Sequence, residues 1–143
     1  MYHYIESGLN NVWLSNGFTV RKYDDGEAVA IADVEGLHAA IGRNLSAKGY
    51  LTGNEFRFLR KELGLSQNRF AGWIGLTEDM VSKWERLGRV PKMAARFMQS
   101  IYLEKLDGNV KITEMVERLA SLDREDHTKV VFEDTNSGWR EAA

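Results

Sequence analysis

The chain has 143 residues, 43% of them hydrophobic, and a formal net charge of −2. This length predicts one domain, or one domain with a small appendage, and the apolar fraction favours a packed core over a disordered chain. The absence of cysteine excludes disulfides and thiolate metal sites. The three histidines lack the spacing of metal ligands, so we expect no metal and no cofactor.

The first residues, MYHYIESGLNN, do not combine a basic region with a following apolar run. We therefore expect no secretory leader. No stretch approaches the apolar length of a membrane-spanning helix, so no membrane partner is expected. These patterns predict a cytoplasmic protein.

The charges are unevenly distributed. Residues 52–105 hold ten Lys and Arg against six Asp and Glu, whereas both flanking segments carry net negative charge. A basic centre of this kind is typical of a core that contacts nucleic acid. Chance clustering in a chain with 28% charged residues is the alternative.

Residues 1–50 are predicted to form a small antiparallel β-meander followed by one helix, for dimer or partner contact. The strands are expected in short runs rich in β-branched and aromatic residues, which are Val12–Leu14, Phe18–Val20 and Ala28–Ile31. Asn16-Gly17 and Asp25-Gly26 lie between these runs and are strong hairpin signals.

Asp33 is a plausible N-cap for a helix that continues to about Ala47. Apolar residues recur there at helical spacing. His38 lies beside this apolar stripe, and we interpret it as a boundary or core histidine in preference to a catalytic base.

Residues 51–107 are predicted to form the main helical domain. Thr52 and Glu55 match a capping box, and Gly64 closes the helix that they open. Ser66 caps a second helix that ends at Gly75.

Thr77 caps a third helix, which ends at Gly88, and Pro91 suits the start of a long apolar helix. Two short helices joined by a turn with glycine form the helix-turn-helix pattern. An ordinary helical hairpin inside an all-α core would give the same apolar spacing. Ser82, Lys83 and Arg86 favour the first interpretation, because they lie away from the apolar face of their helix.

Residues 108–143 are expected to hold an amphipathic helix at 112–122 and a short strand at Thr128–Phe132. The stretch from Asn136 to Ala143 is predicted to be a loose tail, although Trp139 is unfavourable to expose.

The helix-turn-helix segment contains Ser66-Gln67, Ala71, Gly75 and the run from Val81 to Glu85, VSKWE. In these residues it resembles the Xre/Cro family of transcriptional regulators, over roughly Thr52–Leu103. The resemblance implies a mainly α fold with a lambda-repressor-like five-helix DNA-binding core. It also implies a homodimer that binds an inverted-repeat operator in double-stranded DNA, with the recognition helix in the major groove.

Mapped onto this family, Ser82 and Lys83 could contact base edges, and Gln67 would hold a phosphate. Asn68, Arg69, Arg89 and Lys92 are candidate clamps on the DNA backbone. The full set of candidate DNA-binding residues is Gln67, Asn68, Arg69, Thr77, Glu78, Asp79, Ser82, Lys83, Arg86, Arg89 and Lys92.

Glu78 and Asp79 bring negative charge to the end of the helix that should approach DNA. They could accept hydrogen bonds from cytosine amino groups or could stabilise the helix dipole. A further alternative is that the unit is an interaction module that keeps the fold without binding DNA.

The N-terminal run around Tyr4–Phe18, with Gly36-Leu37-His38, resembles regulators close to MqsA/HigA-type antitoxins. Because the zinc-binding cysteines of that type are absent, its zinc domain is not expected here. The resemblance implies an autorepressor at the nucleoid with a possible toxin partner, and a phage anti-CRISPR-associated repressor is equally compatible. We expect no enzyme, since no nucleophile–base pair or phosphate-binding loop is present.

Overall fold

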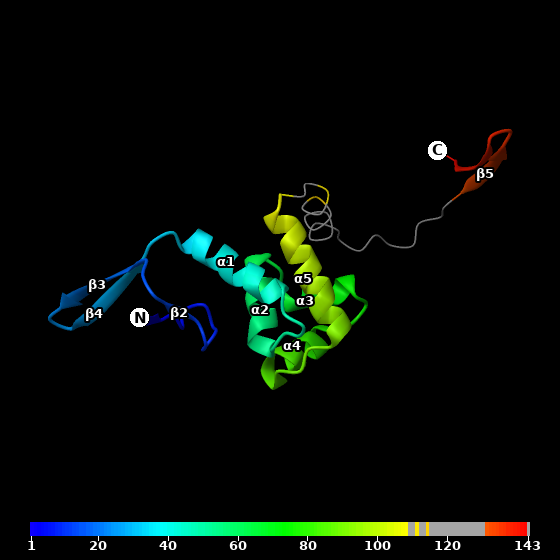
Figure 1. Cartoon of the computed structure of the whole chain (residues 1–143). Helices are drawn as coiled ribbons and strands as arrows, with labels where there is room; N and C mark the ends of the chain where they lie inside the picture. The colour runs from blue at the N-terminus through cyan, green and yellow to red at the C-terminus, as the bar shows by residue number, and fades with distance from the viewer. Residues whose placement is uncertain (109–110, 112–113, 115–130, 143) are drawn as a thin grey trace.

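The computed structural model describes residues 1–108, 111, 114 and 131–142. This part is mainly helical with small antiparallel strand pairs, as the sequence predicts (Figure 1). The helices are α1 (Val34–Ser46), α2 (Gly53–Glu62), α3 (Gln67–Trp73), α4 (Glu78–Leu87) and α5 (Lys92–Leu106). The strands are β1 (Tyr2–His3), β2 (Trp13–Leu14), β3 (Phe18–Tyr23), β4 (Gly26–Ile31), β5 (Phe132–Thr135) and β6 (Gly138–Glu141). None of the helices in these ranges has the length and apolar character needed to cross a membrane.

Short polar side chains start the helices at the predicted residues. At α2, the Thr52 hydroxyl accepts from the Glu55 N–H at 3.3 Å, and the Glu55 carboxylate accepts from the Thr52 N–H at 2.9 Å. Ser66 and Thr77 cap α3 and α4 with their hydroxyls. These caps satisfy backbone donors that a helix cannot satisfy internally. The predicted capping box and both further caps are confirmed.

The predicted three-stranded meander is wrong. β2 pairs with β1, with His3 opposite Trp13, and among the described strands β3 pairs only with β4. Burial explains the difference, because the β1–β2 pairing accompanies burial of Tyr4, Leu9 and Leu14 in the core. Gly17, at φ 77°, then turns the chain before β3.

The β3–β4 hairpin also turns one residue earlier than expected. Tyr23 faces Gly26, so the loop is Asp24-Asp25, and Gly26 becomes the first residue of β4. Gly26 has a φ of 145°, which an L side chain rarely adopts.

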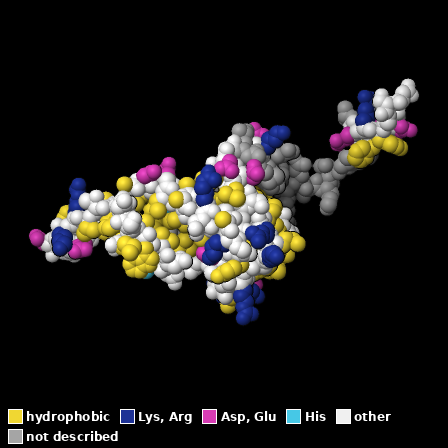
Figure 2. Space-filling model, in the orientation of Figure 1, with side chains coloured by type: hydrophobic (Ala, Val, Ile, Leu, Met, Phe, Trp, Pro, Cys, Tyr) yellow, Lys and Arg dark blue, Asp and Glu magenta, His cyan; other side chains and the backbone are white. Residues whose placement is uncertain are grey.

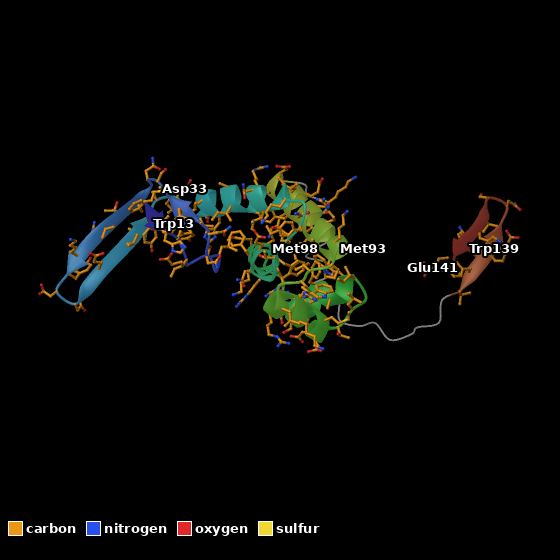
Figure 3. All side chains as sticks on the ribbon, turned by 60° about the horizontal axis from the view of Figure 1, so that its bottom comes forward. Trp13, Asp33, Met93, Met98, Trp139 and Glu141 are labelled. Carbon is orange, nitrogen blue, oxygen red and sulfur yellow. The ribbon has the colours of Figure 1, made fainter. Side chains whose placement is uncertain are left out.

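The core lies where α2, α3, α4 and α5 meet. Its most deeply buried side chains are Phe56, Leu59, Phe70, Val81 and Met98. In Figure 3 Met98 lies among these packed side chains, whereas Met93, on the same helix, is 84% exposed. Residues of α1 and of the N-terminal segment join the same cluster, so the core extends across residue 50.

The chain after α5 is described only in part. The predicted helix at 112–122 falls almost wholly outside the described residues, as do residues 128–130 of the predicted strand. The tail prediction is wrong, because Gly138–Glu141 forms β6 and pairs with β5. Thr135 donates to the Gly138 carbonyl oxygen at 2.7 Å, and this bond closes the turn. Trp139 remains 73% exposed.

Gly53 generates the first testable prediction. A Cβ at this position would lie 2.3 Å from the Glu85 carbonyl oxygen and 2.6 Å from that of Trp84, so α2 touches the backbone of α4 directly. We expect Gly53→Ala to force the helices apart and to lower the free energy of unfolding by about 1–3 kcal/mol.

Urea denaturation measures this loss, and Gly72→Ala in α3 is the matched control. A Cβ at Gly72 meets nothing within 4 Å, so this variant should be neutral or more stable by up to about 1 kcal/mol. Equal losses in the two variants would contradict the close contact.

Candidate nucleic-acid interface

A tight turn joins α3 and α4. Gly75 adopts the left-handed conformation with φ 71°, and the Leu76 N–H donates to the Ala71 carbonyl at 2.9 Å. This is the glycine turn that the sequence predicts between the two helices. It leaves Thr77 in position to cap α4.

Aromatic and aliphatic side chains hold α4 on its inner side. Val81 is fully buried, and the Trp84 and Phe56 rings pack perpendicular to each other at a centroid distance of 6.0 Å. Phe70 of α3 packs on the same Phe56 ring at 5.1 Å. The inner face of α4 is therefore fixed on α2 and α3.

A buried ion pair completes this inner face. Arg60 of α2 donates from Nε to Glu85 Oε2 at 2.8 Å and from Nη2 to Glu85 Oε1 at 2.9 Å. Its Nη1 donates to the Leu65 carbonyl at 2.8 Å. Arg60 is 7% exposed and Glu85 8% exposed, so the pair is shielded from water. Bidentate geometry of this kind is the strongest form of an arginine–carboxylate contact.

Gln67 joins the same network. Its side-chain amide donates to Glu85 Oε1 at 3.1 Å, and the residue is half-buried. The family resemblance implies that Gln67 holds a phosphate; in the structure its side-chain N–H group is directed to Glu85 of α4. Its side-chain carbonyl oxygen has no hydrogen bond within the described residues.

The outer face of α4 carries polar side chains that are paired with one another. Lys83 lies 3.1 Å from Asp79, and the Arg86 Nε donates to the Ser82 hydroxyl at 3.4 Å. Asn68 of α3 reaches the Glu78 carboxylate at 3.4 Å. Ser82 is half-buried, and the other residues named here are exposed. The structure thus gathers these predicted residues on one solvent-facing surface.

Three further predicted residues, Arg69, Arg89 and Lys92, are exposed and form no ion pair within the described ranges. They come from α3, from the α4–α5 turn and from the start of α5. Figure 2 shows Lys and Arg side chains distributed over this end of the helical core. Cations without a carboxylate partner are available to an external anion.

Sequence reasoning missed the role of Arg60 and Glu85. Arg60 lies four residues after Phe56, and Glu85 lies four residues after Val81, so each falls on the apolar stripe of its helix. Opposite charges at apolar positions of two adjacent helices are a signal for a buried pair. Phe58 of α2 is also buried.

A second polar cluster lies on the opposite side of α2. The Tyr4 hydroxyl is 2.7 Å from His38 Nε2, and His38 Nδ1 contacts the Glu62 carboxylate. This confirms a boundary position for His38, half-buried against Phe58. Burial, followed by the charges of Glu6 and Glu62, raises the pKa of the Tyr4 phenol.

The buried pair gives the second prediction. Either Glu85→Leu or Arg60→Met leaves one charge buried without its partner, so each should lower the free energy of unfolding by about 3–5 kcal/mol. The double variant should lose less than either single variant, because no unpaired charge remains.

Chemical denaturation of the four proteins forms a double-mutant cycle. The matched control is Lys83→Ala, which removes one member of an exposed pair and should change stability by less than about 0.5 kcal/mol. If the double variant lost as much stability as the two single variants added together, the pair would not be coupled.

Within the described residues, no group of three or more His, Cys, Asp or Glu side chains is arranged to hold a metal ion. Comparison of the chain with protein-family models, curated proteins and solved structures finds no match.

Proposed function

We propose that the protein is a sequence-specific regulator that binds double-stranded DNA with α4 in the major groove. The observation that carries this proposal is the division of α4 into two faces. Val81 and Glu85 fix the inner face, and Ser82, Lys83 and Arg86 present hydrogen-bonding groups on the outer one. A rigid helix with such an outer face suits reading of base edges. The fold we propose is lambda-repressor-like. The role we propose is not enzymatic.

Flanking cations support the proposal. Arg69, Arg89 and Lys92 are exposed. In the sequence, Arg69 precedes α4, and Arg89 and Lys92 follow it. Contacts of this kind to phosphates position a protein on DNA and supply salt-dependent affinity. Base contacts would then come from α4 itself.

The exposed acidic residues of α4, Glu78 and Asp79, are compatible with this proposal. Asp79 pairs with Lys83, and Glu78 accepts from Asn68. Both also lie in the first turn of α4, where negative charge is favourable. On this basis Asp79 holds Lys83 in the free protein and releases it to a base or phosphate on binding.

We propose further that the regulator acts as a homodimer on an inverted repeat, in the cytoplasm at the nucleoid. An autorepressor role follows from the family resemblance, with a toxin partner or an anti-CRISPR operon as alternative settings. The genes beside its own distinguish these settings.

One observation favours the alternative of an interaction module. Leu87 is 70% exposed and Met93 is 84% exposed, on either side of the turn between α4 and α5. Exposed apolar side chains beside a recognition surface are typical of protein contacts. A partner protein bound there would cover part of the same surface.

The third prediction concerns DNA binding to the region upstream of the protein's own gene. Lys83→Ala and Arg86→Ala should each weaken specific binding by about 5- to 150-fold, which corresponds to a base contact of about 1–3 kcal/mol. Arg89→Ala should weaken binding to all sequences alike and reduce the salt slope by about one. Footprinting and titrations at several salt concentrations measure these effects.

Lys61→Ala is the matched control, because it removes an exposed cation of α2 that lies beside the Glu6–Gly8 loop. Its effect on specific binding should be small. Asp79→Asn should strengthen binding by removing repulsion. Salt-insensitive or absent binding, with a partner protein that copurifies stably, would favour the interaction module instead.

A further inference from the structure

The β3–β4 hairpin extends from the helical core as a two-stranded ribbon (Figure 1). Figure 3 shows the base of the ribbon beside Trp13 and Asp33, where α1 begins. No other strand of the described residues pairs with either edge. An isolated two-stranded ribbon is only marginally stable in water, so its edges are candidates for pairing.

One face of the ribbon is apolar from its base to its middle, and the facing pair Lys22 and Glu27 lies on the same face near the tip. Phe18 faces Ile31, and Val20 faces Val29, so the four side chains lie on the same side. At the base, Phe18 packs against Tyr2 with a centroid distance of 5.5 Å. Farther out, Val20 is 43% exposed and Val29 is only half-buried. The outer part of this apolar row, Val20 and Val29, is therefore partly exposed to solvent.

The backbone hydrogen bonds decide which groups each edge offers. The Ala32 N–H donates to the Gly17 carbonyl at 2.8 Å, which makes this facing pair hydrogen-bonded. Hydrogen-bonded and non-hydrogen-bonded pairs alternate along an antiparallel ladder. The non-hydrogen-bonded residues of β4 are therefore Glu27, Val29 and Ile31, and their N–H and C=O groups point away from β3.

The two edges differ in charge. β3 carries the consecutive residues Arg21 and Lys22, one on each face of the ribbon, and charged side chains on a strand edge discourage its pairing. β4 has the uncharged run Ala28–Ile31, with Glu27 as the single acidic residue of the strand. The β4 edge is therefore the one suited to pairing.

From these observations we infer that two copies of the chain pair through antiparallel β4 strands, with Val29 of one copy opposite Val29 of the other. In this register the outward groups of Glu27 and Ile31 face those of Ile31 and Glu27 in the second copy. The result is a four-stranded sheet in which the Val20–Val29 rows of both copies lie side by side and form an apolar centre on one face, with Glu27 of each copy opposite Ile31 of the other.

A second copy fits better than another partner, because the assembly closes on itself. Once the β4 edges are paired, both outer edges of the sheet are β3, with Arg21 and Lys22 in each. Such edges resist further addition, so growth stops at a symmetric dimer. The inference rests on the proposed function in one respect, which is that a dimer supplies the second recognition helix.

Cysteine cross-linking tests the register directly, because the native chain contains no cysteine. Facing residues in such a pair lie about 5.5 Å apart at Cα, within the range of a disulfide. Val29→Cys should yield a disulfide-linked dimer under mild oxidation. Val20→Cys, on the facing strand and the same face, is the matched control and should remain largely monomeric on a denaturing gel.

Proline substitution tests the edge without cross-linking. Val29→Pro removes the outward N–H of β4, and Val20→Pro removes the corresponding N–H of β3. Proline is tolerated at an edge N–H that faces solvent, so both hairpins should persist. By sedimentation without DNA, Val29→Pro should be monomeric, whereas Val20→Pro and the unchanged chain should be dimeric at tens of micromolar.

An unchanged chain that sediments as a monomer, a Val29→Pro variant that stays dimeric, or equal cross-linking through Val20 and Val29 would each overturn the inference. The outcome is separable from that of DNA binding. A β4-linked dimer without DNA affinity keeps this inference and removes the proposed function. A monomeric chain that still footprints on its operator keeps the proposed function and removes this inference.

Discussion

The contact on which the rest of the candidate site depends is the buried pair of Arg60 and Glu85. Each charge would be strongly unfavourable alone in the core, so the two residues must meet. The guanidinium is directed by both Glu85 oxygens and by the Leu65 carbonyl, and Gln67 adds a hydrogen bond from α3. Because these partners come from separate elements, the pair fixes the rotation of α4 about its own axis.

That rotation decides what α4 exposes. With Val81, Trp84 and Glu85 turned inward, helical geometry places Ser82, Lys83 and Arg86 on the outer side. Gly53 makes this possible, since only a residue without Cβ lets α2 approach the carbonyl groups of Trp84 and Glu85 so closely. The contacts of the inner face thus determine which residues the outer face of α4 presents. Substitutions in α2 should therefore alter this outer face, although α2 is no part of it.

Local signals in the sequence predicted the helices well. Thr52, Ser66 and Thr77 act as caps, and Gly75 ends α3, because capping depends on neighbouring residues alone. Strand pairing was not predictable in the same way. The partner of β2 is chosen by burial of Leu14 in a core formed by distant residues, and the tail pairs with β5 although its sequence suggested a loop. The Arg60–Glu85 pair joins positions 25 apart in the chain, and charge alone did not reveal that both are buried.

The paired outer face of α4 has a consequence for affinity and specificity. Glu78, Asp79, Lys83 and Arg86 carry no net charge together, so this face alone has little general attraction for a polyanion. An exposed pair such as Asp79–Lys83 is worth only about 0.3–0.5 kcal/mol, whereas one good base contact contributes about 1–3 kcal/mol. The free energy needed to open this pair is therefore small beside the gain from one good base contact. Under the proposed function, α4 supplies discrimination, and affinity comes from the flanking cations Arg69, Arg89 and Lys92.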